Sequence, residues 1–268
     1  MHDLNTIIGD FAEAGRRLAQ IGASDGAAGN ISALLGRGEI DSRDYPHAEP
    51  LPVPHRGPEL AGCVFVVTGS GRRLREIGDD PPGNLALVTF DESGQAATLH
   101  TSPRRRFERL TVEFNSHLAV HRDQIVRGGS DFHAIIHAQP LNLTYLSHIP
   151  AYRDESYLNR RILRWEPESI YHLSEGVAVV PFYVPASEGL ERANVEAMRT
   201  HHVALWSKHG IMARSDASVK RACDLIEYAE VGARFERLNL ATGEPAEGLT
   251  DDEIRLICST FGVRQSIF

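Results

Sequence analysis

The first candidate for chemistry is a histidine near the end of an apolar run. Residues 132–138 (FHAIIHA) include His137 and are followed by Gln139 and Pro140. Side chains of a strand alternate between faces, so His137 and Gln139 are expected to point the same way. Two imidazoles at this spacing would form half of a metal site, and here one of the two positions carries an amide. The alternative for His137 is a strand-end histidine that hydrogen-bonds to the backbone.

A second histidine also comes after an apolar run. His209 follows residues 202–206 (HVALW) and precedes Gly210, which permits a tight turn and the close approach of a ligand. Two strand-end histidines, each followed by a turn, suit a site at one edge of a sheet. Zinc and related divalent ions bind imidazole nitrogen readily.

Glu113 is the third candidate. It opens an expected helix whose face continues through His117 and His121, four and eight residues later. A carboxylate here is suited to general acid/base catalysis or to metal binding. Two alternatives stay open. The stripe is a solvated helix face with Glu113 at the positive end of the helix dipole, or its three residues form a metal trio by themselves.

Two glycine turns offer backbone N–H groups. Gly29 and Asn30 follow the first expected helix, and residues 69–71 (GSG) follow a β-rich run. The N–H groups of such turns can hold an anion or a sugar oxygen. Neither turn has the spacing of a dinucleotide or nucleoside-triphosphate loop, and each alone is also consistent with an ordinary turn.

The elements that must position these residues follow from hydrophobic periodicity and turn signals. Helices are expected at residues 4–21, 111–125, 141–149, 190–200, 218–240 and from 251 onward, and strands at 63–68, 85–90, 97–100, 132–138, 176–184 and 202–206. Residues 26–32 are expected to form a turn and residues 36–60 a long surface excursion. Interleaved helices and partly hairpin-linked strands predict a mixed sheet with helices on both faces.

Composition narrows the class of protein. The chain has 268 residues, 42% of them hydrophobic, and a net charge of −8, so a nucleic acid is a poor partner. Three widely spaced cysteines favour reduced thiols and a cytoplasmic location. No secretion signal and no membrane span is expected. Without a linker-like segment, residues 1–268 are expected to form a single domain.

Taken in order, these motifs resemble those of the class II aldolase/adducin family and, within it, the rhamnulose-1-phosphate aldolase branch. The resemblance covers nearly the whole chain. The matching segments are Gly29-Asn30-Ile31-Ser32, residues 67–71 (VTGSG), Thr111-Val112-Glu113 with His117, residues 133–140 and His209-Gly210.

The resemblance implies a three-layer α/β/α fold around a largely antiparallel sheet, and a homotetramer. It implies reversible aldol cleavage of a sugar phosphate or related hydroxy-carbonyl compound through a metal-stabilised enediolate. Glu113 would be the acid/base. The metal ligands would be His137, His209 and, in place of a third histidine, Gln139. The residues expected to hold the substrate are Gly29, Asn30, Ser70, Gly71 and Thr111.

Three departures from the family pattern have physical consequences. An amide at Gln139 is a poorer match for zinc than imidazole, so manganese is the alternative to zinc. Val112 and Ala27 stand where the family has polar residues, which removes hydrogen-bond donors from the phosphate end of the site. These changes keep two alternatives open: a metal-dependent decarboxylase or epimerase of the same fold, and a non-catalytic adducin-like scaffold.

Overall fold

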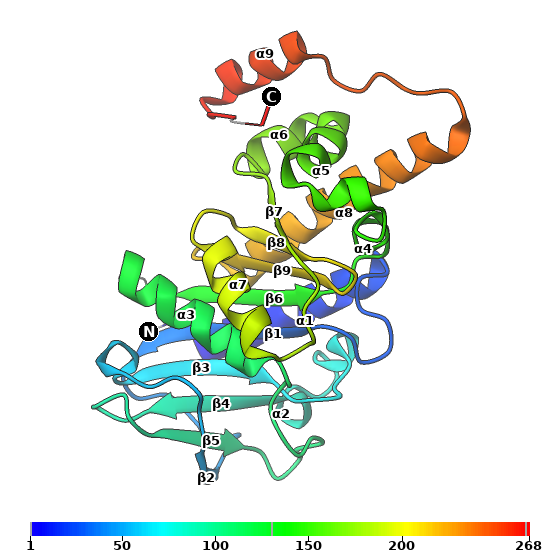
Figure 1. Ribbon diagram of the computed structural model, residues 1–268. Helices are drawn as coiled ribbons and strands as arrows, with labels where there is room; N and C mark the ends of the chain where they lie inside the picture. The colour runs from blue at the N-terminus through cyan, green and yellow to red at the C-terminus, as the bar shows by residue number, and fades with distance from the viewer. Residues whose placement is uncertain (1, 130, 266) are drawn as a thin grey trace.

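One sheet organises the part of the chain that the computed structural model describes, namely residues 2–129, 131–265, 267 and 268. This sheet has nine strands in the order β2-β5-β4-β3-β1-β6-β9-β8-β7 (Figure 1). The strands are β1 (Asn30–Arg37), β2 (His47–Leu51), β3 (Cys63–Thr68), β4 (Leu85–Phe90), β5 (Ala97–Thr101), β6 (His133–Ala138), β7 (Val177–Val180), β8 (Val203–Trp206) and β9 (Gly210–Ser215). Neighbouring strands are antiparallel except for the β7–β8 pair.

Helices cover both faces of this sheet. The α-helices of the described residues are α1 (Leu4–Gln20), α2 (Pro81–Asn84), α3 (Phe114–Gly128), α4 (Leu141–Leu146), α5 (Glu155–Ile162), α6 (Pro167–His172), α7 (Glu188–Met198), α8 (Val219–Thr242) and α9 (Asp251–Phe261), of which α9 packs on α6 and not on the sheet. The helices α3 and α7 lie on one face, and α1 and α8 on the other (Figure 1). The predicted three-layer α/β/α class with a mixed, largely antiparallel sheet is confirmed.

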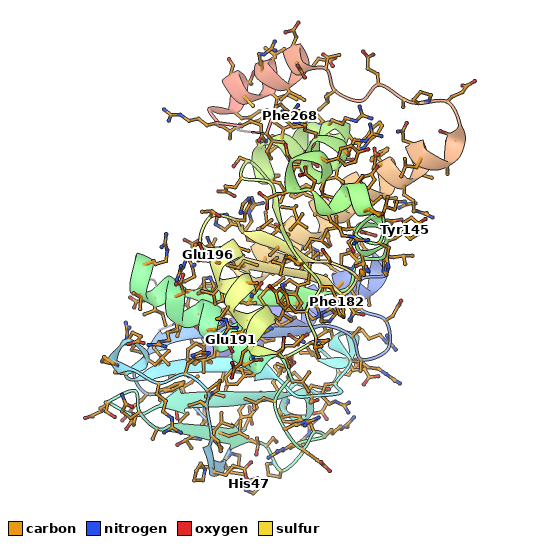
Figure 2. All side chains as sticks on the ribbon, in the orientation of Figure 1. His47, Tyr145, Phe182, Glu191, Glu196 and Phe268 are labelled. Carbon is orange, nitrogen blue, oxygen red and sulfur yellow. The ribbon has the colours of Figure 1, made fainter. Side chains whose placement is uncertain are left out.

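Strands in the middle of the sheet are buried on both faces. In β3, Val64 and Val66 belong to the core beneath α1 and α8, whereas Phe65 and Val67 belong to the core beneath α3. On the α3 side, the Asn115 side chain donates a hydrogen bond to Glu191 of α7 at 2.9 Å, which ties the two covering helices together. Glu191 is labelled in Figure 2. The two layers of helices therefore each enclose apolar side chains of the same strands.

The main error of the sequence prediction concerns residues 30–37. They were expected to be the end of a turn and the start of a surface excursion, but they form β1, which lies between β3 and β6. Ile31, Ala33 and Leu35 alternate as in a strand, but the opposite face carries the polar Asn30 and Ser32, which are nevertheless only 7% and 0% exposed. The excursion also contains β2, which is exposed at the edge of the sheet, as a surface segment would be.

The sequence prediction also missed β9, α5 and α6, and the expected strand at residues 176–184 ends at Val180. Several other elements follow the prediction. The hairpin of β4 and β5 forms as expected, and Pro181 directly follows β7 at the opposite edge of the sheet. Thr250 caps α9 through a reciprocal capping box with Glu253. Among the described residues, no helix is both long and apolar enough to cross a membrane.

A buried glutamate anchors the segment that follows β6. Glu230 of α8 accepts hydrogen bonds from the backbone N–H groups of Asn142 and Leu143 at 3.0 and 2.9 Å, and from the Asn142 side chain at 2.6 Å. These N–H groups belong to the first turn of α4, where backbone N–H groups have no acceptor within the helix itself. Glu230 thereby fixes α4 immediately after Gln139 and Pro140.

We expect Glu230→Ala to lower the free energy of unfolding by about 2–4 kcal/mol, because three buried donors lose their acceptor. Urea denaturation followed by circular dichroism measures this difference. Glu244→Ala, at an exposed glutamate beyond α8, is the matched control and should change stability by less than about 0.5 kcal/mol. Equal stability of the two variants would contradict the anchoring role.

Candidate functional site

The three candidate side chains converge at one end of the central strands. Glu113 immediately precedes α3, His137 lies near the end of β6, and His209 lies in the turn between β8 and β9. The Nε2 atom of His137 is 3.5 Å from Oε2 of Glu113, and the Nε2 atom of His209 is 3.5 Å from Oε1. Glu113 and His137 are only 3% and 1% exposed.

Backbone geometry places His209. Lys208 adopts a left-handed conformation with φ +64°, and its N–H donates to Oγ of Ser147 at 2.7 Å, which holds the turn. Gly210 then brings β9 against the end of β6. A Cβ atom on Gly210 would lie 2.4 Å from the carbonyl oxygen of Ala138 and 3.0 Å from the His137 ring. The glycine that the sequence pattern singled out is therefore required by this close approach.

The His137 ring is held in one orientation. Its Nδ1 donates to the carbonyl oxygen of Ile211 at 2.8 Å, and its face stacks on Trp206 with the ring centroids 4.6 Å apart. Trp206 is itself fixed by a hydrogen bond to Asn194 at 2.8 Å. In the neutral ring this arrangement leaves the lone pair of Nε2 facing Glu113, as in metal sites where a second partner sets the tautomer.

The donor set fits a divalent cation. Two ligand atoms of a tetrahedral zinc site, each about 2.1 Å from the ion, lie about 3.4 Å apart. The two distances of 3.5 Å match this spacing, and ligand atoms of Glu113, His137 and His209 all lie within 4.8 Å of one another. Neutral imidazole lone pairs that face a buried carboxylate repel it, and a cation bound between them would turn this repulsion into coordination.

The Glu113 carboxylate points toward this cluster and makes no hydrogen bond to the N–H groups of its own helix. It accepts a hydrogen bond from Nδ2 of Asn30 at 2.8 Å. Burial alone would raise the pKa of the Glu113 carboxyl, but His137 and the Asn30 hydrogen bond outweigh burial and hold this pKa below its usual value. Burial also lowers the pKa of His209 to about 4, so this ring is neutral at pH 7.

The predicted residues line one cavity of about 250 Å³. Those that line it are Gly29, Asn30, Ser70, Gly71, Thr111, Glu113, His137, Gln139 and His209. Hydrogen bonds between backbones bring the turns together. Ser70 donates to Arg109 at 2.9 Å, Thr111 donates to Thr68 at 3.1 Å, and Gln139 donates to Ala23 at 2.8 Å.

Some cavity residues were not anticipated. Pro185, from the segment between β7 and α7, lines the cavity, and the Trp206 ring stacks on the His137 ring. A single sequence carries no signal for either contact, because both depend on how distant segments pack. His117 and His121 do not form a metal trio with Glu113. Both rings lie in the interior and contact Ser32.

Comparisons with known proteins agree with this architecture. The family model of the class II aldolase and adducin N-terminal domain matches residues 9–236. The rhamnulose-1-phosphate aldolase of Yersinia pseudotuberculosis serotype IB (strain PB1/+) is 31% identical over 243 residues, which cover 88% of this chain and 86% of the relative. The rhamnulose-1-phosphate aldolase of Yersinia pestis is 30% identical with the same coverage. A crystal structure of a sugar-phosphate aldolase from Thermotoga maritima has a TM-score of 0.76 at 26% identity, covering 91% of this chain and 98% of that one.

We expect Gly210→Ala to lower the free energy of unfolding by about 1–3 kcal/mol, because the added methyl group forces β9 away from β6. The same displacement moves His137, so zinc affinity in a chelator competition should fall by roughly tenfold or more. Gly9→Ala is the matched control, since a Cβ at Gly9 of α1 meets nothing within 4 Å. Wild-type stability in Gly210→Ala would show that the close approach is not required.

Proposed function

Because this chain belongs to the class II aldolase and adducin family, we propose that it uses a divalent cation in the reversible aldol cleavage of a sugar phosphate or a related hydroxy-carbonyl compound. The enzyme class itself follows from the comparisons: the chain is a class II aldolase, a carbon–carbon lyase. The convergence of Glu113 with two imidazoles, in a cavity lined by both glycine turns, is the observation that carries the proposal.

The cation would be held by Nε2 of His137 and Nε2 of His209, with the amide oxygen of Gln139 as a further ligand. Zinc is the proposed ion, and manganese is the alternative because an amide oxygen suits it better. When bound, such an ion supplies Lewis-acid stabilisation of negative charge that develops on the substrate oxygens.

Glu113 is proposed as the general acid/base. Its carboxylate lies at the wall of the cavity, and its lowered pKa keeps it ionised and ready to accept a proton at neutral pH. It would move a proton to and from the substrate carbon at which the bond breaks.

Backbone N–H groups and hydroxyls are proposed to hold the substrate. Neither lysine nor arginine is among the described residues that line the cavity. A phosphate would therefore depend on the turns at Gly29 and Gly71 and on the hydroxyls of Ser70 and Thr111. Val112 is 49% exposed and adds no donor beside Thr111.

Three further features are part of the proposal. We expect residues 1–268 to act as a single domain, located in the cytoplasm, and to assemble as a homotetramer. Exposed apolar side chains support an assembly: Leu141, Tyr145, Phe182 and Val184 are 65%, 51%, 57% and 67% exposed. Tyr145 and Phe182 can be seen at the surface in Figure 2.

We expect the purified protein to bind one equivalent of zinc or manganese, and His137→Ala and His209→Ala to weaken this binding by more than about 100-fold. Metal analysis after dialysis against each ion measures the stoichiometry. His100→Ala, at a histidine of β5 remote from the cavity, is the control and should bind metal normally. A native protein that binds neither ion after loading would exclude the metal-dependent mechanism and favour the scaffold.

Activity should depend on Glu113 in a different way. Glu113→Gln should retain most of its metal but lose roughly 10²- to 10⁴-fold in kcat, because the amide cannot accept the proton. An aldol-cleavage assay with ketose 1-phosphates and the corresponding free ketoses identifies the substrate class. Carbon dioxide or an epimer in place of an aldehyde product would identify the decarboxylase or epimerase alternative.

We expect Gln139→His to raise zinc affinity by roughly tenfold or more, because imidazole nitrogen is a better zinc ligand than an amide oxygen. Manganese affinity should change much less, so the ratio of the two constants is the quantity to measure. Gln95→His, in the exposed β4–β5 turn, adds a histidine away from the site as a control. An unchanged zinc affinity in Gln139→His would place this side chain outside the ligand set.

A further inference from the structure

A row of polar side chains leads from the candidate site into the interior, between β1, β6 and α3. Each member is 7% exposed or less, and each contacts the next. In order of contact they are Glu113, Asn30, His117, Ser32, His121 and His133. We refer to this row as the polar chain. Buried polar groups of this kind are costly unless each is hydrogen-bonded, which makes the polar chain a feature that requires an explanation.

The polar chain forms because the distance between every second residue of β1 is nearly equal to the distance between every fourth residue of α3. Asn30 and Ser32 are two residues apart on β1 and share one face, which spans about 6.6 Å. Glu113, directly before α3, is followed at spacings of four residues by His117 and His121 of α3, and each such step along a helix rises about 6 Å. Asn30 therefore lies between Glu113 and His117 and contacts both. In the same way Ser32 lies between His117 and His121 and contacts both.

The direction of the hydrogen bonds is fixed at the Glu113 end. An ionised carboxylate can only accept, so Asn30 must present its Nδ2–H to Oε2 of Glu113, at 2.8 Å. The Oδ1 atom of Asn30 then faces Nε2 of His117 at 2.5 Å and must accept a proton from it. His117 therefore carries its proton on Nε2.

The same logic continues into the interior. Nδ1 of His117 accepts from Oγ of Ser32 at 2.7 Å, and this Oγ accepts from Nε2 of His121, also at 2.7 Å. Nδ1 of His121 then accepts from Nδ1 of His133 at 2.9 Å. Each hydrogen bond donates toward Glu113, which aligns the bond dipoles with the negative charge.

Neutral rings are required for this assignment, and their surroundings favour them. Burial lowers the pKa of His117 and of His133 to about 3, and it lowers the pKa of His121 well below its usual value. A neutral imidazole has one donor and one acceptor nitrogen, so each ring can take only the one tautomer that continues the chain.

We propose that His117, Ser32, His121 and His133 are positioning residues: their one-directional hydrogen bonds fix the Asn30 amide with its N–H toward Glu113. The Asn30 side chain is an amide, which neither gains nor loses a proton near neutral pH, so the polar chain does not conduct protons. It holds Asn30, and Asn30 holds the carboxylate in the orientation in which its two oxygens face His137 and His209. The kinetic consequence of this inference rests on the proposed function, whereas the hydrogen-bond directions do not.

The tautomers provide a test that needs no substrate. Long-range ¹H–¹⁵N spectra of the ¹⁵N-histidine-labelled full chain distinguish protonated from unprotonated ring nitrogens. We expect neutral rings protonated on Nε2 at His117 and His121 and on Nδ1 at His133, with each signal assigned by its loss in a single substitution. A proton on Nδ1 of His117 would reverse the direction of the chain and overturn the inference.

Kinetics test the positioning role. His117→Leu removes the donor to Asn30 and should lower kcat roughly 10- to 100-fold while KM changes less than about threefold. His117→Gln can place an amide N–H near the position of Nε2, and we expect it to retain kcat within about threefold of wild type. Wild-type kcat in a folded His117→Leu variant, or an equal loss in both variants, would overturn the positioning role.

Two controls separate this effect from a general loss of structure. Thr89→Ala removes a hydroxyl–imidazole contact of 2.9 Å with His100 elsewhere in the sheet, and kcat should stay unchanged. If thermal denaturation shows that His117→Leu does not fold, Ser32→Ala replaces it. That variant removes one oxygen atom and should lower kcat by roughly threefold to tenfold. If wild-type protein cleaves no aldol substrate, the proposed function fails and the tautomers alone decide the inference.

Discussion

A carboxylate that is almost completely buried determines the arrangement around it. Removing the charge of Glu113 from water costs several kcal/mol unless donors and positive charge compensate for it. The fold brings these partners from distant parts of the sequence: Asn30 from β1, His137 from β6 and His209 from the β8–β9 turn. The interior position of β1, next to β6, is therefore as important for the site as the residues that would perform the chemistry.

The site and its support use the same faces of the same strands. Asn30 pairs with His137 across β1 and β6, and Leu34 pairs with His133 at the other end of this register. Because side chains alternate along a strand, His137 and His133 lie on one face, the former in the cavity and the latter in the interior. A slip of β6 by one residue would turn His137 and His133 to the opposite face, away from Asn30.

Much of the site could be predicted from the sequence, because histidines at strand ends and glycines at turns have local signatures. His137, His209, Glu113 and both glycine turns line one cavity, as the sequence indicated. The strand β1 was missed because one of its two buried faces begins with Asn30 and Ser32, whose burial is stabilised by partners on α3 and not by hydrophobicity. The contacts of Trp206 and Pro185 depend on packing between distant segments, which no periodicity reports.

Charge balance connects the polar chain with the candidate cation. With the donor direction set by Glu113, the carboxylate receives one N–H from Asn30, and the ring nitrogens that face it carry lone pairs when His137 and His209 are neutral. One neutral donor does not balance a buried negative charge, and a cation bound between the imidazoles and the carboxylate would supply the remaining compensation. The proposed ligands His137 and His209 would hold such a cation, and the carboxylate would balance its charge. Gln139 lines the same cavity and offers an amide oxygen, so it bears on which cation binds.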